Sequence, residues 1–398
     1  MANQKDEGID RSFKYLLYSR ALRSTAMIYM SLAFSLYLTA LGVGVFEVGI
    51  IAAAAVAFMV LLTMAGGFIG DRVGYRVEML VVEFTALAGV TIVAFSTGLA
   101  YVVAGIVLLG LGGGAGGMRG AFAPGTNALI ANNYADEKRR IRAYSVVTVV
   151  SAVFSICGSI MFGLITPLST YVGELNAYRY MFAIAALLIA LSVVSIAMLK
   201  ESKHHRKTTM IMKRGSISYS LRVMAANSLG GAGIGLAIPL LPLWFKLSYG
   251  ATPMDIGIVF GIAYIATALG AYASAMRARA LRALEIASYT RAVNGAMLII
   301  MALSPFFALA AALYIVRSAM AGLGGPSRST VNVRGISAED YGTATSVQGV
   351  AMRMAQLSSA ASGYLMEEGL PLPLVFEGVL QLLSGLGYKL LLNRKGRI

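Results

Sequence analysis

Twelve runs of mostly apolar residues, each about 20 residues long or longer, make up most of this sequence. A helix needs roughly 20 apolar residues to cross the hydrocarbon core of a lipid bilayer. The pattern therefore predicts an all-α polytopic membrane protein with twelve transmembrane helices, embedded in a lipid bilayer. The runs lie near 24–45, 47–70, 77–97, 99–124, 143–165, 178–199, 217–245, 253–276, 283–304, 305–327, 343–366 and 371–392.

The composition supports a membrane protein and argues against a nucleic-acid partner. Of the 398 residues, 58% are hydrophobic and 13% are charged, whereas a soluble domain carries about 25% charged residues. The formal net charge of +15 is gathered in short clusters between the apolar runs. The first apolar run is too long for the core of a signal peptide, so we expect a retained first span.

The positions of the charged clusters predict the orientation. Basic clusters follow the even-numbered runs, whereas the other connections carry mostly acidic residues. Basic residues favour the cytoplasmic side, so we expect a multi-pass protein of the cell membrane with both termini cytoplasmic and an even number of spans. The clusters are Arg72 with Arg76, Lys138–Arg142, Lys200–Arg214, Arg277–Arg282, Arg334 and Lys389–Arg397.

The two halves of the sequence resemble each other. The spacing of Gly67, Asp71 and Arg76 recurs in Gly270, Ser274 and Arg279. Duplicated six-span units are typical of secondary transporters. We expect a cytoplasmic N-terminal segment over 1–23, a six-helix bundle over 24–199, a cytoplasmic linker over 200–216, a second bundle over 217–392 and a cytoplasmic tail over 393–398.

One short motif between the second and third runs is specific. GFIGDRVGYR, Gly67–Arg76, resembles the loop signature G-x-L-a-D-r-x-G-r-k of the major facilitator superfamily, with Ile69 and Tyr75 departing from it. YRYMF at 178–182 is similar to the superfamily's W-R-x-x-F. The resemblance implies the superfamily's fold and a transporter rather than an enzyme, with no catalytic residue, metal or cofactor.

The resemblance also implies that this loop gates the cytoplasmic side. Asp71 lies where its carboxylate can meet the partly positive N-terminus of the eleventh span near Gly342. Gly67 would let two helices approach closely, and Gly74 would permit a tight turn. The alternative is a well-made turn with a local Asp–Arg pair. The expected gating residues are Gly67, Asp71, Arg72, Gly74, Arg76 and Arg119.

A glycine-rich run, Gly110–Gly120, contains a literal G-x-G-x-x-G. A dinucleotide site would need a strand before this motif and a helix after it, but the run lies inside the fourth span. We therefore expect close helix packing or a bend there. The sequence also has no G-x-x-x-x-G-K-[ST] loop, so ATP-driven transport is not expected.

The resemblance places the first, fourth, seventh and tenth spans around the central cavity, and none of these spans contains Asp or Glu. Glu83 and Glu377 lie on spans expected at the periphery. Arg317 and Arg353 fall near the middle of the membrane, where an arginine faces a cavity or a partner. Guanidinium groups bind carboxylates and phosphates; the alternative is that neighbouring helices satisfy both side chains. The expected substrate-binding residues are Arg317, Arg353, Asn227, Tyr29, Tyr37 and Tyr264.

We predict a monomeric secondary active transporter that moves a small solute across the cell membrane by alternating access. Efflux of amphipathic compounds is the default expectation. Transport of an organic or inorganic anion is the alternative, favoured by the buried arginines, and a membrane-embedded enzyme or non-transporting scaffold is the remote one. Coupling to a proton or another ion stays open; without a cavity acid, Glu83 or a substrate carboxylate would have to carry the proton.

Overall fold

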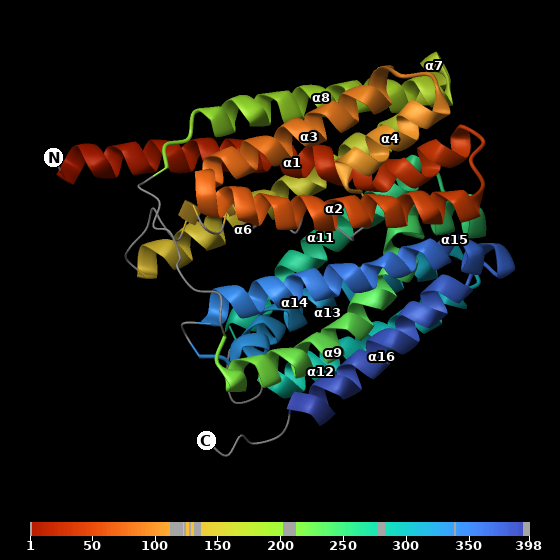
Figure 1. The fold of residues 1–398 in the computed structure, drawn as a ribbon. Coiled ribbons are helices and arrows are strands. Elements are labelled where there is room, and N and C mark those ends of the chain that lie inside the picture. Colours follow the sequence, from red (N-terminus) through yellow and green to blue (C-terminus); the bar gives the residue numbers. More distant parts are fainter. Residues whose placement is uncertain are drawn as a thin grey trace. The chain divides into compact units, whose positions relative to one another are not determined.

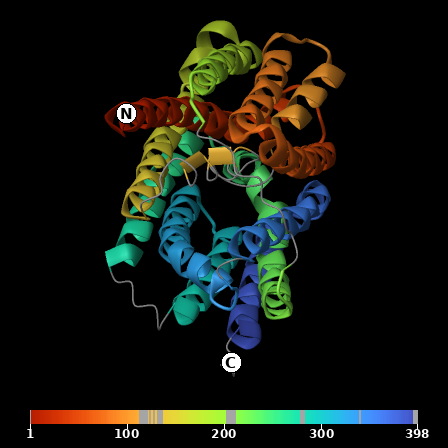
Figure 2. The same cartoon turned by 60° about the vertical axis from the view of Figure 1, so that its left-hand side comes forward.

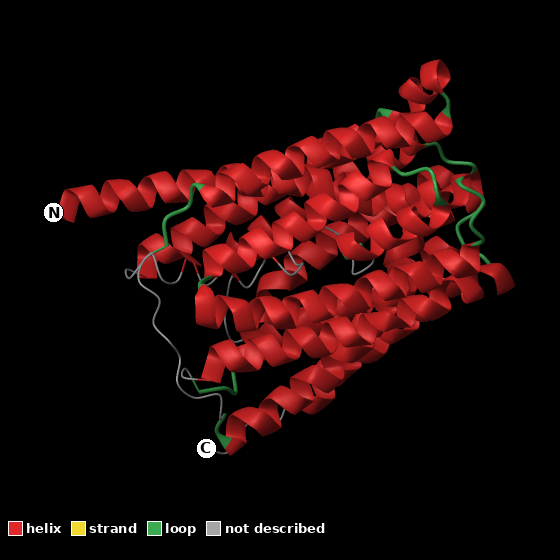
Figure 3. Ribbon diagram, turned by 45° about the horizontal axis from the view of Figure 1, so that its top comes forward, coloured by secondary structure: helices red, strands yellow, loops and turns green. Residues whose placement is uncertain are grey.

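The computed structural model describes the backbone of residues 2–111, 122, 125–126, 129–130, 137–201, 212–276, 283–337 and 340–392. The side chains of 2–11, 71, 137, 138, 140, 141, 275, 341 and 342 lie outside the described part. The described residues are helical almost throughout and contain no strand (Figure 3).

Two compact units can be distinguished, and most of the helices of each are labelled in Figure 1. Unit 1 holds the described residues among 1–42, 54–111 and 115–208, and unit 2 holds those among 43–53 and 209–398. The helices of the first half are α1 (Ala2–Ala40), α2 (Val45–Val73), α3 (Tyr75–Phe95), α4 (Leu99–Leu109), α6 (Glu137–Gly163), α7 (Ile165–Val172) and α8 (Glu174–Ala197). Those of the second half are α9 (Arg214–Ala237), η1 (Ile238–Leu240), α10 (Leu241–Tyr249), α11 (Pro253–Met276), α12 (Ala283–Ala302), α13 (Phe307–Val333), α14 (Tyr341–Ala355), η4 (Gln356–Ser358), α15 (Ser359–Glu368) and α16 (Leu372–Leu392).

Each of the expected apolar runs coincides, in its described part, with a helix or with a helix that is briefly interrupted. Eight stretches of the described residues are long and apolar enough to cross a membrane. The described parts of the other four expected spans do not reach these limits of length and hydropathy; they correspond to α1, α4, α12 and the α14–η4–α15 segment. The eight are Val45–Gly70, Tyr75–Phe95, Arg142–Val172, Glu174–Ala197, Arg214–Tyr249, Pro253–Ser274, Phe307–Val333 and Leu372–Leu392.

The fourth expected span is not a single straight helix. α4 ends at Leu109 because Gly110 adopts a left-handed conformation with φ 65°, which glycine reaches without steric cost. A Cβ at Gly110 would also lie 3.1 Å from the Met59 Cβ. Residues 112–121, the rest of the glycine-rich run, lie outside the described residues.

The two units repeat one packing pattern. In unit 1, α1 packs against α6 and α8, and α3 packs against α4 and α8. In unit 2, α9 packs against α14 and α16, and α12 packs against α13 and α16. The same order of partners in both units agrees with the duplication expected from the sequence.

Glycines allow the closest of these helix contacts. A Cβ built at Gly89 on α3 would lie 2.8 Å from the Gly105 carbonyl oxygen on α4, and a Cβ at Gly105 would lie 2.8 Å from the Gly89 oxygen. A Cβ at Gly378 on α16 would lie 2.6 Å from the Gly295 oxygen on α12. These distances are too short for any larger residue, as is common where membrane helices pack closely.

The N-terminal part of α1 is buried further than its polar sequence suggests. α1 is one continuous helix (Figure 1 and Figure 2), and its Leu16 is fully buried in a cluster with Ile196 and Leu199. The Ser19 and Ser192 hydroxyls are 2.9 Å apart, and Ser12 Oγ accepts a hydrogen bond from the Lys200 amide at 3.0 Å. The polar start of α1 therefore packs along the end of α8.

Candidate functional site

The turn between α2 and α3 consists of a single residue. Gly74 has φ 126°, a region that L side chains rarely adopt, so the chain reverses here only because the residue is glycine. Next to the turn, the Arg72 guanidinium lies over the Phe68 ring, 3.8 Å from its centroid. The structure thus gives the signature loop a short, sterically restricted turn.

An acid that sequence reasoning did not select completes this turn. Glu201 follows α8 and accepts hydrogen bonds from the backbone amides of Tyr75 and Arg76, both at 3.0 Å. The Arg76 guanidinium in turn donates to the Ala197 carbonyl. The only sequence signal is an isolated acid among the basic residues that follow the sixth run, which does not reveal a partner more than 120 positions earlier.

The structure gives little support for close packing at Gly67 and does not describe the side chains of Asp71 and Arg119. Among the described residues, no atom lies within 4 Å of the position that a Cβ at Gly67 would take, and the close approaches fall instead at Gly66 and Gly70, beside the Glu78 side chain. Asp71 lies on the last turn of α2, and its side chain is outside the described residues. Arg119 is also outside them, so its gating role stays a prediction.

Unit 1 contains a buried ion pair between α1 and α3. The Arg23 guanidinium donates to Glu83 Oε2, and only 4% of the Arg23 side chain and none of Glu83 is exposed. Arg23 also lies over the Phe122 ring, 4.7 Å from its centroid. Among the described residues, Glu83 Oε1 and Arg23 Nε have no hydrogen-bond partner, so each member keeps unused hydrogen-bonding capacity.

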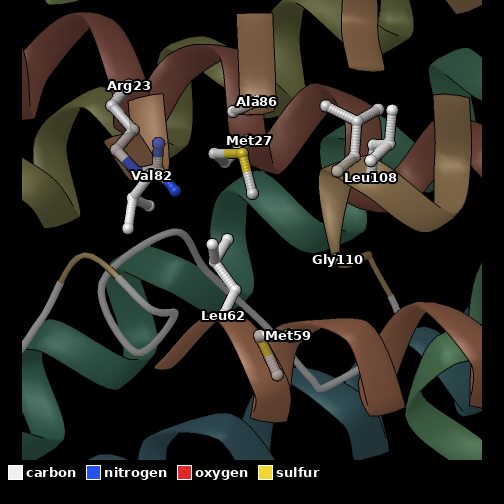
Figure 4. Close-up of a pocket in the computed structure, with 9 residues that line it drawn as sticks. Arg23, Met27, Met59, Leu62, Val82, Ala86, Leu108 and Gly110 are labelled. Carbon is white, nitrogen blue, oxygen red and sulfur yellow. The ribbon is translucent and has the colours of Figure 1, made fainter. Parts of the chain in front are cut away.

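The same arginine lines a small pocket within unit 1. Arg23 is the only charged residue among the described residues that line it, and Figure 4 shows Arg23 at one end and Leu108 and Gly110 at the other. The remaining lining residues are apolar, two of them methionines. The pocket is lined by Arg23, Met27, Met59, Leu62, Val82, Ala86, Leu108, Leu109 and Gly110.

Unit 2 contains a second buried ion pair. Arg317 Nη2 on α13 lies 2.9 Å from Glu377 Oε1 on α16, with 12% of the arginine side chain exposed and none of the glutamate. The sequence placed Glu377 on a peripheral span and left Arg317 without a countercharge. The structure instead brings the two together, because α13 and α16 both pack against α12.

Asn227, expected at the substrate site, takes part in a polar network inside unit 2. Its Oδ1 accepts a hydrogen bond from Arg291 Nη2 at 2.8 Å and another from the Tyr388 hydroxyl at 2.7 Å. Arg291 also donates to Ser384. Both acceptor positions of the Asn227 oxygen are thus used by contacts that join α9, α12 and α16.

The two tyrosines expected at the cavity pack against α8. Tyr29 donates to the Tyr178 carbonyl at 3.0 Å, and the Tyr37 hydroxyl accepts from Arg179 Nε at 3.3 Å. Both side chains are fully buried, and both rings pack against Phe182. In this structure their hydroxyls serve contacts within unit 1.

The two remaining candidates are partly buried in unit 2. Tyr264 lies near the middle of α11. Arg353 lies in the last turn of α14, where the partial negative charge of a helix C-terminus favours a cation. The helix breaks just beyond it at η4, so its position has a local structural explanation beside the expected binding role.

The chain belongs to the major facilitator superfamily, whose sequence model matches residues 16–360. It is therefore a multi-pass membrane transporter and not an enzyme, as the sequence predicted. A comparison with curated proteins gave no match.

Solved structures of transporters share its fold. The fold is similar to that of an auto-inhibited peptide transporter of the POT family, with a TM-score of 0.76, 12% identity and 98% of each chain covered. It is also similar to the human organic anion transporter MFSD10 (TETRAN), with a TM-score of 0.67, 14% identity and coverage of 96% of this chain and 99% of that one. A bacterial homolog to the human lysosomal transporter Spinster gives a TM-score of 0.70 at 13% identity, covering 96% and 95%. At these identities the likeness concerns the fold alone.

Proposed function

We propose that this transporter is a secondary active transporter for amphipathic compounds that carry an acidic group, working by alternating access between its two six-helix halves. The observation that supports the substrate class is the pocket of unit 1. It places one guanidinium, that of Arg23, at the end of a lining that is otherwise apolar. This proposal joins the amphipathic and the anionic solutes that the sequence left as alternatives.

The charge of the pocket favours an anion over a cation. A guanidinium binds a carboxylate or phosphate through parallel hydrogen bonds, and in surroundings of low dielectric constant opposite charges attract far more strongly than in water. Although Glu83 pairs with Arg23, it is not among the described residues that line the pocket, so a solute there meets the guanidinium and not the carboxylate. The pocket is small in this structure, so a solute that directs its acidic group towards Arg23 and its apolar part towards Leu108 would have to widen it.

The apolar lining suits a solute with a hydrocarbon or aromatic body. Met27 and Met59 have flexible, polarizable side chains that adapt to different shapes. One solved structure of similar fold is described as an organic anion transporter, so an acidic solute is within the range that this fold carries. Efflux as the direction, the cell membrane as the location and cytoplasmic termini are proposed from the sequence pattern and the superfamily resemblance.

The substrate class can be tested with three probes of one skeleton: 4-phenylbutyrate, its methyl ester and 4-phenylbutylamine. A ligand that binds the folded state raises the unfolding temperature in proportion to the logarithm of its concentration over Kd. We expect the carboxylate to stabilise the purified protein most, the ester less and the amine least. Stabilisation by the amine alone would contradict the proposal.

A matched set of variants assigns the effect to the pocket. Arg23→Lys keeps the charge without the two-pronged geometry and should weaken carboxylate binding. Arg23→Met with Glu83→Gln removes both charges and should abolish the preference for the carboxylate without leaving a buried unpaired charge. Arg334→Ala, at an exposed arginine of unit 2, is the control. Carboxylate binding that persists in the double variant would overturn the assignment.

A further inference from the structure

We propose that Glu201 is a positioning residue that holds the signature turn in place from the end of α8. Its two carboxylate oxygens each accept one backbone hydrogen bond, from the amides of Tyr75 and Arg76, at 3.0 Å. These two residues begin α3. Glu201 thus caps the helix that follows the signature turn, although it lies more than 120 positions further along the sequence.

The turn needs a cap from elsewhere because it cannot supply its own. The first amides of a helix have no partner within the helix, and a side chain at the N-cap position usually accepts from them. Here the N-cap is Gly74, and no side chain caps α3 locally. The positive φ of Gly74 favours glycine at this position, and a Cβ there would lie 2.9 Å from Glu201 Oε2. Because the one-residue turn requires glycine at the N-cap, no local side chain can accept from the first amides of α3. Glu201 accepts from them instead.

A second contact runs in the opposite direction. The Arg76 guanidinium donates to the carbonyl of Ala197, the last residue of α8, where carbonyls lack helical partners. A carboxylate at the start of α3 and a guanidinium at the end of α8 each complement the dipole of the helix they meet. The two contacts together connect the turn to the end of α8, so both ends are expected to move as one piece.

The two contacts, Glu201 with the start of α3 and Arg76 with the end of α8, are called the clamp below. The clamp lies next to the residue expected to gate the transporter. Asp71 lies three residues before Gly74, on the last turn of α2. The gating role expected for Asp71 requires the signature turn to stay in one place. Glu201 is also the second residue of the central linker, 200–216. We infer that the start of the linker, through Glu201, sets the position of the signature turn.

The structural part of the proposal is tested by hydrogen–deuterium exchange of the full-length protein in nanodiscs. Glu201→Gln keeps the size of the side chain but loses the charge and one acceptor oxygen. We expect the amides of Tyr75 and Arg76 to exchange roughly tenfold faster in this variant, because hydrogen bonds to charged groups are the stronger ones. Glu368→Gln, the same change at an exposed acid of α15, should leave the turn unchanged. Wild-type exchange in Glu201→Gln, or faster exchange in all helices alike, would overturn the proposal.

The functional part rests on the proposed function and uses transport of 4-phenylbutyrate into proteoliposomes. We expect Glu201→Gln to reduce the rate several-fold while its unfolding temperature stays close to that of the wild type, and Glu201→Asp to recover part of the rate. Equal rates for wild type and Glu201→Gln would overturn the positioning role. If the wild type transports none of the probe, the proposed substrate is contradicted. The exchange measurement would still test whether Glu201 holds the signature turn.

Discussion

Among the described residues, each unit buries one arginine–glutamate pair, and the two pairs differ in what surrounds them. In both, a single oxygen of a fully buried glutamate meets the guanidinium, and the other oxygen has no hydrogen-bond partner among the described residues. Arg23 lines a pocket of otherwise uncharged residues and is only 4% exposed. Arg317 lies 5.7 Å from the Tyr314 ring and is 12% exposed. Similar pairs are thus set in different environments.

The pairs also occupy different places in the repeated architecture. Arg23 and Glu83 join α1 and α3, whereas in unit 2 the helices with equivalent packing, α9 and α12, are joined by Asn227 and Arg291. Arg317 and Glu377 join α13 and α16 instead. The duplication therefore preserves helix packing but not the polar contacts. Apolar packing tolerates many sequences, while a buried charge requires a specific partner.

The largest expected effect comes from breaking the unit 1 pair. Arg23→Met leaves Glu83 buried without its countercharge, which costs about 3–5 kcal/mol of unfolding free energy. Arg23→Met with Glu83→Gln should recover most of this loss. Arg317→Met should cost less, about 1.5–3 kcal/mol, because 12% of the Arg317 side chain is exposed against 4% of the Arg23 side chain, so the unit 2 pair is less completely buried. Denaturant unfolding of the three variants in detergent measures the difference.

Equal losses for Arg23→Met and Arg317→Met would show that exposure does not distinguish the two pairs. No recovery in the double variant would show that packing around the Arg23 stem, rather than the charge pair, holds α1 to α3.

The signature turn of unit 1 and its counterpart in unit 2 give the next prediction. Asp71→Asn removes the charge expected to meet a helix N-terminus, an interaction of up to about 2 kcal/mol, so transport should fall roughly tenfold while stability changes little. Ser274→Ala, at the position that corresponds to Asp71 in the second half, should change transport much less. Initial rates in proteoliposomes with both variants test this contrast, and normal transport by Asp71→Asn would contradict the gating role.

Ligand binding sharpens the comparison of the two arginines. We expect Arg317→Lys to bind 4-phenylbutyrate within about threefold of the wild type, a change below 1 kcal/mol, because Arg317 is not among the described residues that line the pocket of unit 1. The same substitution at Arg23 should weaken binding more. Thermal-shift titrations of both variants decide between the two sites. A stronger loss at Arg317 would move the anion site to unit 2, where the sequence alone had placed it.

The sequence predicted local features well and long-range partners poorly. The apolar runs specify their own helices, and the signature motif specified the superfamily. The position of Gly74 also indicated a tight turn. Each of these depends on residues close together in the chain, where helix period, hydropathy and glycine conformation act directly.

The burial of Arg23 and the partners of the buried acids could not be predicted from residues close together in the sequence. The sequence placed Arg23 at the end of the expected N-terminal segment, yet four residues of this segment recur at helical spacing and form one buried face of α1: Ser12, Leu16, Ser19 and Arg23. That spacing was the missed signal. Glu83, Glu201 and Glu377 meet partners on helices remote in sequence, and no local pattern specifies such pairs.

The smallest expected effect concerns Asp340, an acidic residue at the N-cap of α14 in unit 2. Asp340 in unit 2 accepts hydrogen bonds from the Ser337 hydroxyl at 2.7 Å and the Lys213 amide at 3.1 Å. The hydroxyls of Ser216 and Ser337, together with the Lys213 amide, lower the pKa of Asp340 below its usual value. A carboxyl with a lowered pKa in the folded state stabilises the protein above its unfolded pKa. That contribution is lost as the pH falls through the folded-state value.

We therefore expect the unfolding temperature of the wild type to fall between about pH 5 and pH 2 by slightly more than that of Asp340→Asn. The variant has no carboxyl at this position to protonate, so its temperature should be lower than the wild type at neutral pH and approach it in acid. Parallel pH profiles would show that these hydrogen bonds do not affect stability. A deficit of Asp340→Asn that grows in acid would show that the protonated form is the more stable one.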